Sequence, residues 1–145
     1  MQREMIYKLQ STIDRLERKQ IDVSNKLYKR SPNYMHDKEE LTRLEDFFEN
    51  NIMPMHQVDE AGFIVNANKA DYTNLGYSRE EYIGSHSSKH FASKTTYDFI
   101  IKELEAFRPL WKVKAKLVRK DGSIVNVSIT STYNGGLTRC IIIPE

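Results

Sequence analysis

Apolar side chains in the first 29 residues recur at alternating spacings of three and four, which is the heptad pattern of a helix. The segment contains no glycine or proline, and charged residues flank the apolar seam. So narrow a seam predicts a helix that pairs with a second copy as a coiled coil. The alternative is a single amphipathic helix that lies on its own domain. The seam positions are Ile6, Leu9, Ile13, Leu16, Gln20, Val23 and Leu27.

A proline marks the end of this first helix. Pro32 lacks an amide N–H and clashes with the preceding helical turn, and Ser31 before it suits the cap of a new helix. We therefore expect a coiled-coil helix over residues 1–30, a cap helix with its joint over 31–46, and a domain over 47–145. The apolar face of the second helix consists of Leu41, Leu44, Phe47 and Phe48.

After Asn50 the apolar positions alternate with polar ones, which is the period of a β-strand. Asp121-Gly122 and Asn134-Gly135-Gly136 are hairpin turns that join the last three strands, so we expect an antiparallel sheet. The predicted strands cover residues 52–59, 62–66, 110–119, 123–133 and 137–143.

Short helices separate the second predicted strand from the third. Residues 67–75 form one helix that Gly76 ends, and Ser78 with Glu81 forms the capping box of the next. A longer helix covers residues 94–107. Its buried face consists of Tyr97, Ile100, Ile101 and Leu104. Two strands, several helices and three further strands define an α+β domain.

Composition and charge narrow the class of protein. A chain of 145 residues is long enough for one ordinary domain and an appendage. The net charge of +2 is spread without a basic block, so no nucleic-acid partner is expected. No apolar run approaches the ~20 residues that span a bilayer, and the N-terminus has no apolar signal core. We therefore expect a cytoplasmic protein without a membrane partner. The single cysteine, Cys140, excludes an intrachain disulfide and a multi-cysteine zinc site.

Several linked motifs between Leu41 and Ile143 resemble those of a PAS domain of the bacterial sensor histidine kinase type. They are Phe48-Glu49-Asn50, Asp59 with Gly62, Asn66-Ala67-Asn68, Leu75-Gly76-Tyr77, Glu80-Glu81-Tyr82-Ile83-Gly84, Lys120-Asp121-Gly122-Ser123 and Thr138-Arg139-Cys140. The resemblance implies a five-stranded antiparallel sheet with short helices on one face, in a sensory and pairing module without an active site. Such domains commonly end in Asp-Ile-Thr, where this chain has Ile143-Pro144-Glu145.

The resemblance also implies a cavity between the long helix and the sheet. Each residue that could line it is explained equally well as core of a small domain. A single buried histidine such as His56 is more often a hydrogen-bonded structural group than a ligand. The pocket candidates are His56, Val58, Tyr72, Leu75, Phe91, Phe99, Trp111 and Ile129.

The cofactors of this family leave no specific mark on the sequence. Its flavin photosensors use a cysteine within Asn-Cys-Arg-Phe-Leu-Gln, and its haem sensors usually use a histidine of the long helix; residues 94–107 contain neither. Covalent flavin and haem are therefore not expected, and non-covalent flavin has no signature. His86 and His90 have the spacing of two metal ligands on a helix. The neighbouring serines favour a solvated loop and no third ligand is evident, so no metal site is predicted.

Two functions of different classes follow. The first is a cytoplasmic sensory PAS module that dimerises through its N-terminal helix and relays a ligand or partner signal to an output domain, such as a two-component histidine kinase. The alternative is a ligand-free PAS scaffold for dimerisation and protein interaction, and a haem- or flavin-binding redox sensor ranks below both. The sequence has no phosphate loop, nucleophile elbow or paired apolar carboxylates, so neither an enzyme nor a catalytic residue is predicted.

Overall fold

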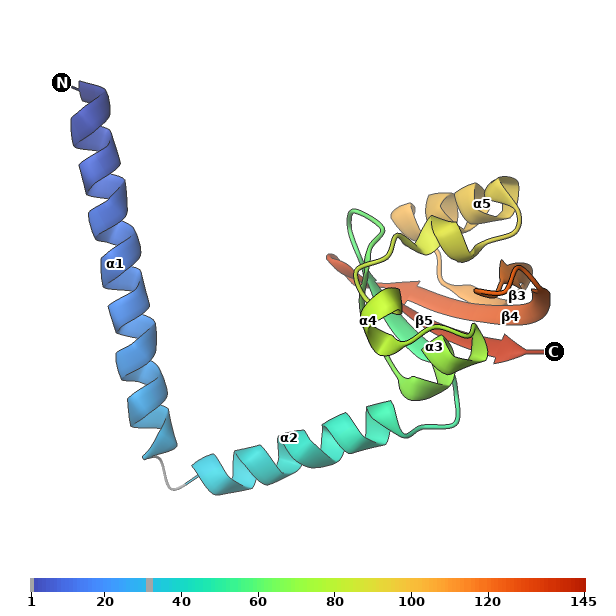
Figure 1. The fold of residues 1–145 in the computed structure, drawn as a ribbon, viewed down its shortest axis with the longest axis horizontal. Coiled ribbons are helices and arrows are strands. Elements are labelled where there is room, and N and C mark those ends of the chain that lie inside the picture. Colours follow the sequence, from blue (N-terminus) through green and yellow to red (C-terminus); the bar gives the residue numbers. More distant parts are fainter. Residues whose placement is uncertain (1, 31–32) are drawn as a thin grey trace. The chain divides into compact units, whose positions relative to one another are not determined.

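The computed structural model describes residues 2–30 and 33–145 of the chain. These residues belong to two compact units, residues 1–43 and residues 44–145, and each unit is described by itself. The first unit is helical, and the second carries the sheet that is drawn in orange, red and green in Figure 1.

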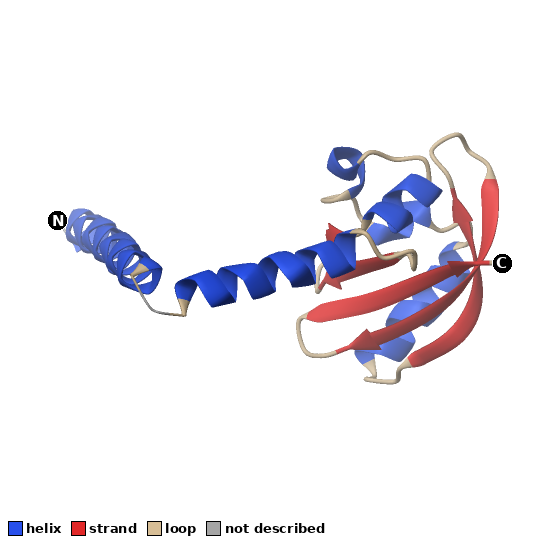
Figure 2. Cartoon of the chain, turned by 90° about the horizontal axis from the view of Figure 1, so that it is seen from below, coloured by secondary structure: helices blue, strands red, loops and turns tan. Residues whose placement is uncertain are grey.

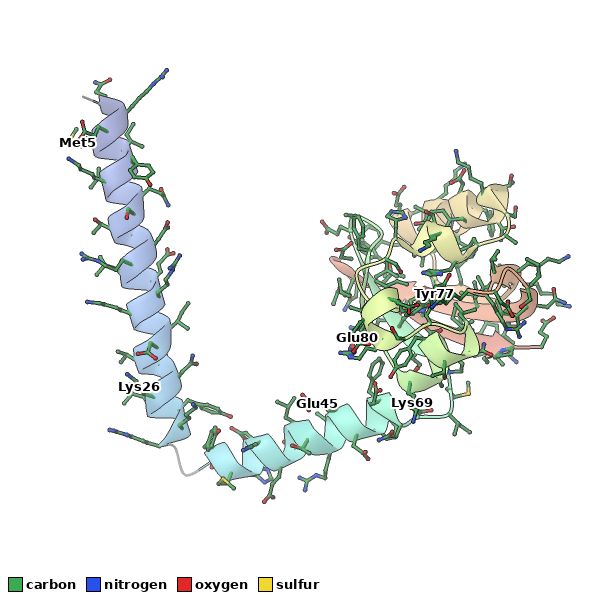
Figure 3. The ribbon with its side chains drawn as sticks, viewed as in Figure 1. Met5, Lys26, Glu45, Lys69, Tyr77 and Glu80 are labelled. Atoms are coloured by element: carbon green, nitrogen blue, oxygen red, sulfur yellow. The ribbon has the colours of Figure 1, made fainter. Side chains whose placement is uncertain are left out.

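Two helices precede the sheet. α1 (Gln2–Lys29) and α2 (Tyr34–Glu49) flank the break predicted at Ser31-Pro32, which itself lies outside the described residues. Ion pairs one turn apart, Glu4–Lys8 and Asp22–Lys26, each at 2.9 Å, support α1. Every seam position of α1 is exposed, and side chains project from all around this helix in Figure 3. None of the described helices is long and apolar enough to cross a membrane.

A five-stranded antiparallel sheet forms the base of the second unit (Figure 2). The strand order is β2-β1-β5-β4-β3, so the first and last strands of the chain pair with each other inside the sheet. This arrangement confirms the predicted α+β fold. The strands are β1 (Met55–Asp59), β2 (Ile64–Ala67), β3 (Leu110–Val118), β4 (Ile124–Tyr133) and β5 (Leu137–Pro144).

β1 begins at Met55, later than the predicted start at residue 52. The Asn51 side-chain oxygen accepts a hydrogen bond from Met53 N at 2.9 Å, which turns the chain before the strand. The side chain of Asn68 then fixes the start of the strand. Its oxygen accepts from Met55 N at 2.9 Å, and its amide donates to the Met53 carbonyl at 2.7 Å. A residue beyond β2 therefore decides where β1 starts.

Four short helices follow β2 in the described second unit and lie over one face of the sheet (Figure 1). They are α3 (Lys69–Asn74), α4 (Arg79–Tyr82), the 3₁₀-helix η1 (Ser87–His90) and α5 (Lys94–Glu105). Ser78 caps α4 as predicted, because its hydroxyl accepts from Glu81 N at 3.2 Å. α5 ends two residues before the predicted end, since Phe107 adopts a left-handed conformation with φ 57°.

The core fills the space between these helices and the sheet. Along β4 the side chains of Val125, Val127, Ile129 and Ser131 are buried, which is the alternation expected of a sheet covered on one face. The helices contribute Tyr72, Tyr82, Ile100 and Leu104 to this core. Tyr72 and Tyr82 lie on helices of six and four residues, which are too short to show a period in the sequence, so packing determines this part of the covering layer.

Candidate functional site

A small cavity lies inside the core, between the helices and the sheet. Its volume is about 40 Å³, which is room for a water molecule or a ligand of similar size. Apolar side chains such as Ile64, Ile100 and Ile142 form much of its wall. Polar groups come from His56, Tyr82, Ser87, His90, Tyr97, Thr138 and Cys140.

Half of the predicted pocket residues line this cavity. They are His56, Val58, Phe91 and Ile129. Tyr72 and Leu75 are buried in the core but are not part of the cavity wall. Phe99 and Trp111 are 50% and 75% exposed, so their prediction as cavity-wall residues is wrong.

A backbone irregularity accounts for the error at Trp111, and the helix face accounts for the error at Phe99. The pairing of β3 with β4 shifts register between Leu110 and Val113, and Lys112 in this irregularity has φ 51°. Trp111 consequently faces solvent, where the Lys112 ammonium lies 5.5 Å from its ring centroid. Phe99 lies on the exposed side of α5, next to the stripe that the helix buries.

The central polar pair of the site joins β1 to α3. His56 Nδ1 and Asp71 Oδ2 are 2.9 Å apart, and the two side chains are 10% and 2% exposed. Burial lowers the pKa of His56, but the Asp71 carboxylate and Cys140 raise it, so the pKa lies well above 6.5. Burial and the same carboxylate raise the pKa of Tyr82 well above 10. His56 therefore retains its proton to a higher pH than an unperturbed histidine, beside one buried carboxylate.

Cys140 brings a thiol to this pair from β5. It lies directly opposite His56 in the β1–β5 ladder, so both side chains leave the sheet on the same face, and both line the cavity. Its sulfur is 3.1 Å from the hydroxyl oxygen of Ser131, and that hydroxyl also donates to the Arg139 carbonyl at 3.0 Å. A thiol, an imidazole and a carboxylate thus come together from β5, β1 and α3.

A second buried histidine, His90, has a lowered pKa, in contrast to His56. The Ser85 hydroxyl donates to the Tyr82 carbonyl at 2.6 Å, so it accepts from His90 Nε2–H at 2.8 Å. Nδ1 of His90 is then an unprotonated acceptor, and it has no hydrogen-bond partner among the described residues. Burial, with the positive charges of Lys89 and His56, lowers the pKa of His90 to about 4. His90 is consequently neutral at physiological pH.

The two histidines considered as metal ligands have separate surroundings. His90 is 3% exposed, so the expectation of a solvated loop is wrong for this residue, because η1 directs it into the core. His86 lies 2.7 Å from the Ser88 hydroxyl through Nδ1 and 3.0 Å from the Ala61 carbonyl through Nε2. Across the described ranges, no three His, Cys, Asp or Glu side chains are grouped as a metal site requires.

An open groove of about 550 Å³ borders the cavity. It runs between the β1–β2 turn, α5 and the β4–β5 hairpin. The residues common to groove and cavity are Val58, Tyr97, Ile101, Leu104 and Thr138, so one layer of side chains separates the cavity from solvent. A flavin or haem ring system needs several hundred Å³, so neither fits the cavity in this conformation.

Sequence reasoning missed most of the polar members of the site. Asp71 and Tyr82 come from helices of six and four residues, which are too short for periodicity to reveal a buried face. The serines near His90 indicate a solvated loop, so the composition of this segment does not reveal that His90 is buried. Cys140 is in phase with buried Ile142 along β5, and this alternation was the one available signal that its thiol points into the core.

The fold agrees with the comparison to known families. The PAS fold family matches residues 42–136, which is more than half of the chain. The chain therefore belongs to the PAS family, whose members are generally sensory modules rather than catalysts. No curated protein matches the chain.

Solved structures show the same architecture. The PAS domain of an HTR-like protein from Haloarcula marismortui aligns with a TM-score of 0.68 at 20% identity, covering 78% of this chain and 98% of that one. A domain of the sensory box sensor histidine kinase/response regulator from Geobacter sulfurreducens gives 0.62 at 14% identity, covering 79% and 98%. A PAS domain from a two-component sensor histidine kinase gives 0.63 at 12% identity, covering 75% and 99%. At these identities the likeness shows the fold.

Proposed function

We propose that this chain is a cytoplasmic sensory module that dimerises through α1 and relays a signal from its PAS core to an output partner such as a histidine kinase. The observation that carries the proposal is the seam of α1, whose apolar positions are all exposed in a single chain. Exposed apolar side chains in one continuous stripe mark an interaction surface. The heptad spacing specifies another helix as the partner, and a second copy supplies one with a matching seam.

A chain of contacts within the second unit supports the relay. The Tyr72 hydroxyl donates to a carboxylate oxygen of Glu49 at 2.8 Å, which ties the end of α2 to α3. The adjacent residue of α3, Asp71, pairs with His56 in the cavity wall. A change in the cavity that shifts α3 therefore acts on the last residue of α2. Such a mechanism needs a ligand or modification with unequal affinity for two arrangements of the helix pair.

The alternative function, a ligand-free pairing scaffold, is favoured by the small size of the cavity. A volume of about 40 Å³ admits no metabolite of ordinary size. The two functions differ in one respect: in a sensor, the chemical state of the cavity changes the pairing of α1, whereas in a scaffold it does not.

Sedimentation equilibrium of two matched variants tests the proposed pairing. Leu16→Glu places a charge in the seam, and Ile21→Glu places the same charge on an exposed isoleucine outside it. We expect a wild-type dimer that Leu16→Glu weakens at least about tenfold, because a buried charge in a helix pair is unpaired. Ile21→Glu should leave the dissociation constant nearly unchanged. Equal effects of the two variants, or a monomeric wild type, would overturn the proposal.

A further inference from the structure

The buried groups around Cys140 have the composition of a reactive thiol site. His56 and Cys140 are direct partners across the β1–β5 ladder, a relation that places Cβ atoms about 4.5–5.5 Å apart. Asp71 holds the imidazole through Nδ1 at 2.9 Å. A cysteine beside a histidine that a third group orients is the arrangement that activates a nucleophile.

Further contacts allow the sulfur to change its charge during a reaction. The Ser131 hydroxyl has a single proton, which it directs to the Arg139 carbonyl while its oxygen lies 3.1 Å from the Cys140 sulfur. Rotation of that hydroxyl would donate the proton to a sulfur that has lost its own. The titratable groups that face His56 from the surrounding elements are Asp71 on α3, Tyr82 on α4, His90 on η1 and Cys140 on β5.

The orphaned nitrogen of His90 points to a small ligand in the same cavity. Its Nδ1 is a buried acceptor without a partner among the described residues, and His90 lines the cavity together with His56 and Cys140. An unsatisfied buried acceptor costs about 1–3 kcal/mol, which a hydrogen-bond donor in the cavity would recover. With about 40 Å³ available, the donor has one or two heavy atoms.

We propose that Cys140 is a site of oxidation by hydrogen peroxide, which enters the cavity and donates a hydrogen bond to His90. This inference names the signal of the proposed sensory module and in that sense rests on it. The sulfur attacks one peroxide oxygen, an S–O bond forms and the O–O bond breaks. His56 donates a proton to the leaving oxygen and regains one from the thiol. Cysteine and peroxide thus give sulfenic acid and water, with sulfur oxidised and peroxide reduced.

Hydrogen peroxide fits this site better than larger oxidants. It has two heavy atoms and two O–H donors, so it can satisfy Nδ1 of His90 within the available volume. One layer of side chains, shared with the open groove, separates the cavity from solvent. A branched hydroperoxide or an aromatic disulfide is too large for the cavity. Selectivity for the smallest hydroperoxide therefore distinguishes this site from an ordinary accessible thiol.

The test measures thiol loss in the full chain at pH 7. Cys140 is the one cysteine, so a thiol titration after quenching and unfolding reports this residue alone, and the methionines do not contribute. We expect hydrogen peroxide to oxidise the folded protein at least about tenfold faster than the urea-unfolded chain, although burial alone would slow it. A dimedone adduct should identify sulfenic acid. Folded protein that reacts no faster than unfolded chain would overturn the proposal.

Three controls separate this chemistry from simple accessibility. tert-Butyl hydroperoxide should lose the folded-state advantage; an equal advantage for both peroxides would exclude the cavity as the site. Moving the thiol along β5, in Cys140→Ser with Ile142→Cys, keeps a cysteine on the same cavity wall but away from His56 and should react slowly. His56→Gln, checked for folding by circular dichroism, should slow oxidation at least about tenfold.

These outcomes are independent of the dimer measurement. A stable dimer whose Cys140 is inert to peroxide would overturn the inference and leave the pairing module standing. A monomeric chain whose Cys140 is rapidly oxidised would overturn the pairing and retain the thiol site. A shift of the dimer dissociation constant after oxidation would show that the state of Cys140 affects the pairing of α1.

Discussion

Two buried histidines in this core have opposite charge states within one small volume. His56 pairs with Asp71 at 2.9 Å, and its pKa lies well above 6.5. His90 has no carboxylate partner, and burial holds its pKa at about 4. The carboxylate beside His56 contributes much of the difference, because both rings are buried and a carboxylate within hydrogen-bond distance offsets the desolvation of the imidazolium. Both histidines therefore make the free energy of unfolding depend on pH. The contribution of His56 decreases as the pH rises, whereas that of His90 decreases as the pH falls.

The pKa of His90 predicts a loss of stability in mild acid. Its folded-state pKa of about 4 lies below the 6.5 of an unperturbed histidine, so stability falls as the pH decreases from about 6.5 toward 4. Each tenfold change in proton affinity corresponds to about 1.4 kcal/mol, which gives a total on the order of 3 kcal/mol. Urea unfolding should show this slope in wild type and in the more exposed control His86→Gln, but reduced in His90→Gln. An unreduced slope in His90→Gln would contradict the assignment.

The turn after β1 requires a glycine for two separate reasons. Gly62 has φ +91°, and a Cβ at this position would overlap the His86 imidazole. Gly122 has a similar φ of +86° but open space around it. Both alanine variants should lose about 1–2 kcal/mol from backbone strain. Gly62→Ala should lose at least about 1 kcal/mol more in urea unfolding, and adding His86→Ala should restore that difference. Equal losses without this rescue would show that the contact is unimportant.

At the scale of elements, α1 and α2 differ from the rest of the chain in what stabilises them. α1 has 28 residues and buries none of them, so its helix rests on propensity, ion pairs and the proposed partner. The last turn of α2, in contrast, is tied to α3 by the bond between Glu49 and Tyr72. In the proposed relay the two helices have different functions. α1 binds the partner helix, and the last turn of α2 moves with α3 when the core changes.

The polar seam residue Gln20 predicts a measurable effect on pairing. A polar side chain at a seam position lowers the stability of a helix pair while it fixes the register. Gln20→Leu should therefore lower the dimer dissociation constant, by about tenfold or more, in sedimentation equilibrium. Asn25→Leu, at an exposed position on the helix face opposite the seam, serves as the control and should have little effect. An unchanged constant in Gln20→Leu would count against this seam.

At the scale of the whole molecule, the division into two units predicts separable behaviour. Residues 44–145 contain the entire sheet, its covering helices and Glu49, so this fragment retains the contacts of the core. It should unfold cooperatively at a midpoint within a few degrees of the full chain, since the stability of a domain follows from its own buried core. It should also be monomeric in sedimentation, because the seam is missing. A dimeric fragment would place the pairing surface on the PAS unit.

The elements that were predicted from the sequence are those with long local patterns. The heptad pattern of α1 extends over about four repeats. In the three C-terminal strands apolar and polar residues alternate over seven or more positions, and hairpin turns join the strands. Boundaries were less accurate, as at β1, where the side chain of Asn68 fixes the start. Trp111 was misplaced because a register shift in β3 has no local signature.

What the sequence determined by itself is the order of elements, the antiparallel fold and the seam of α1, because each follows from the spacing of apolar residues and from turns within a few positions. Tertiary structure decided the site. The distance from His56 to Asp71, the partnership of His56 with Cys140 across β1 and β5, and the orphaned nitrogen of His90 depend on residues far apart in the chain. Strand pairing and helix packing bring them together, and no local period encodes these contacts.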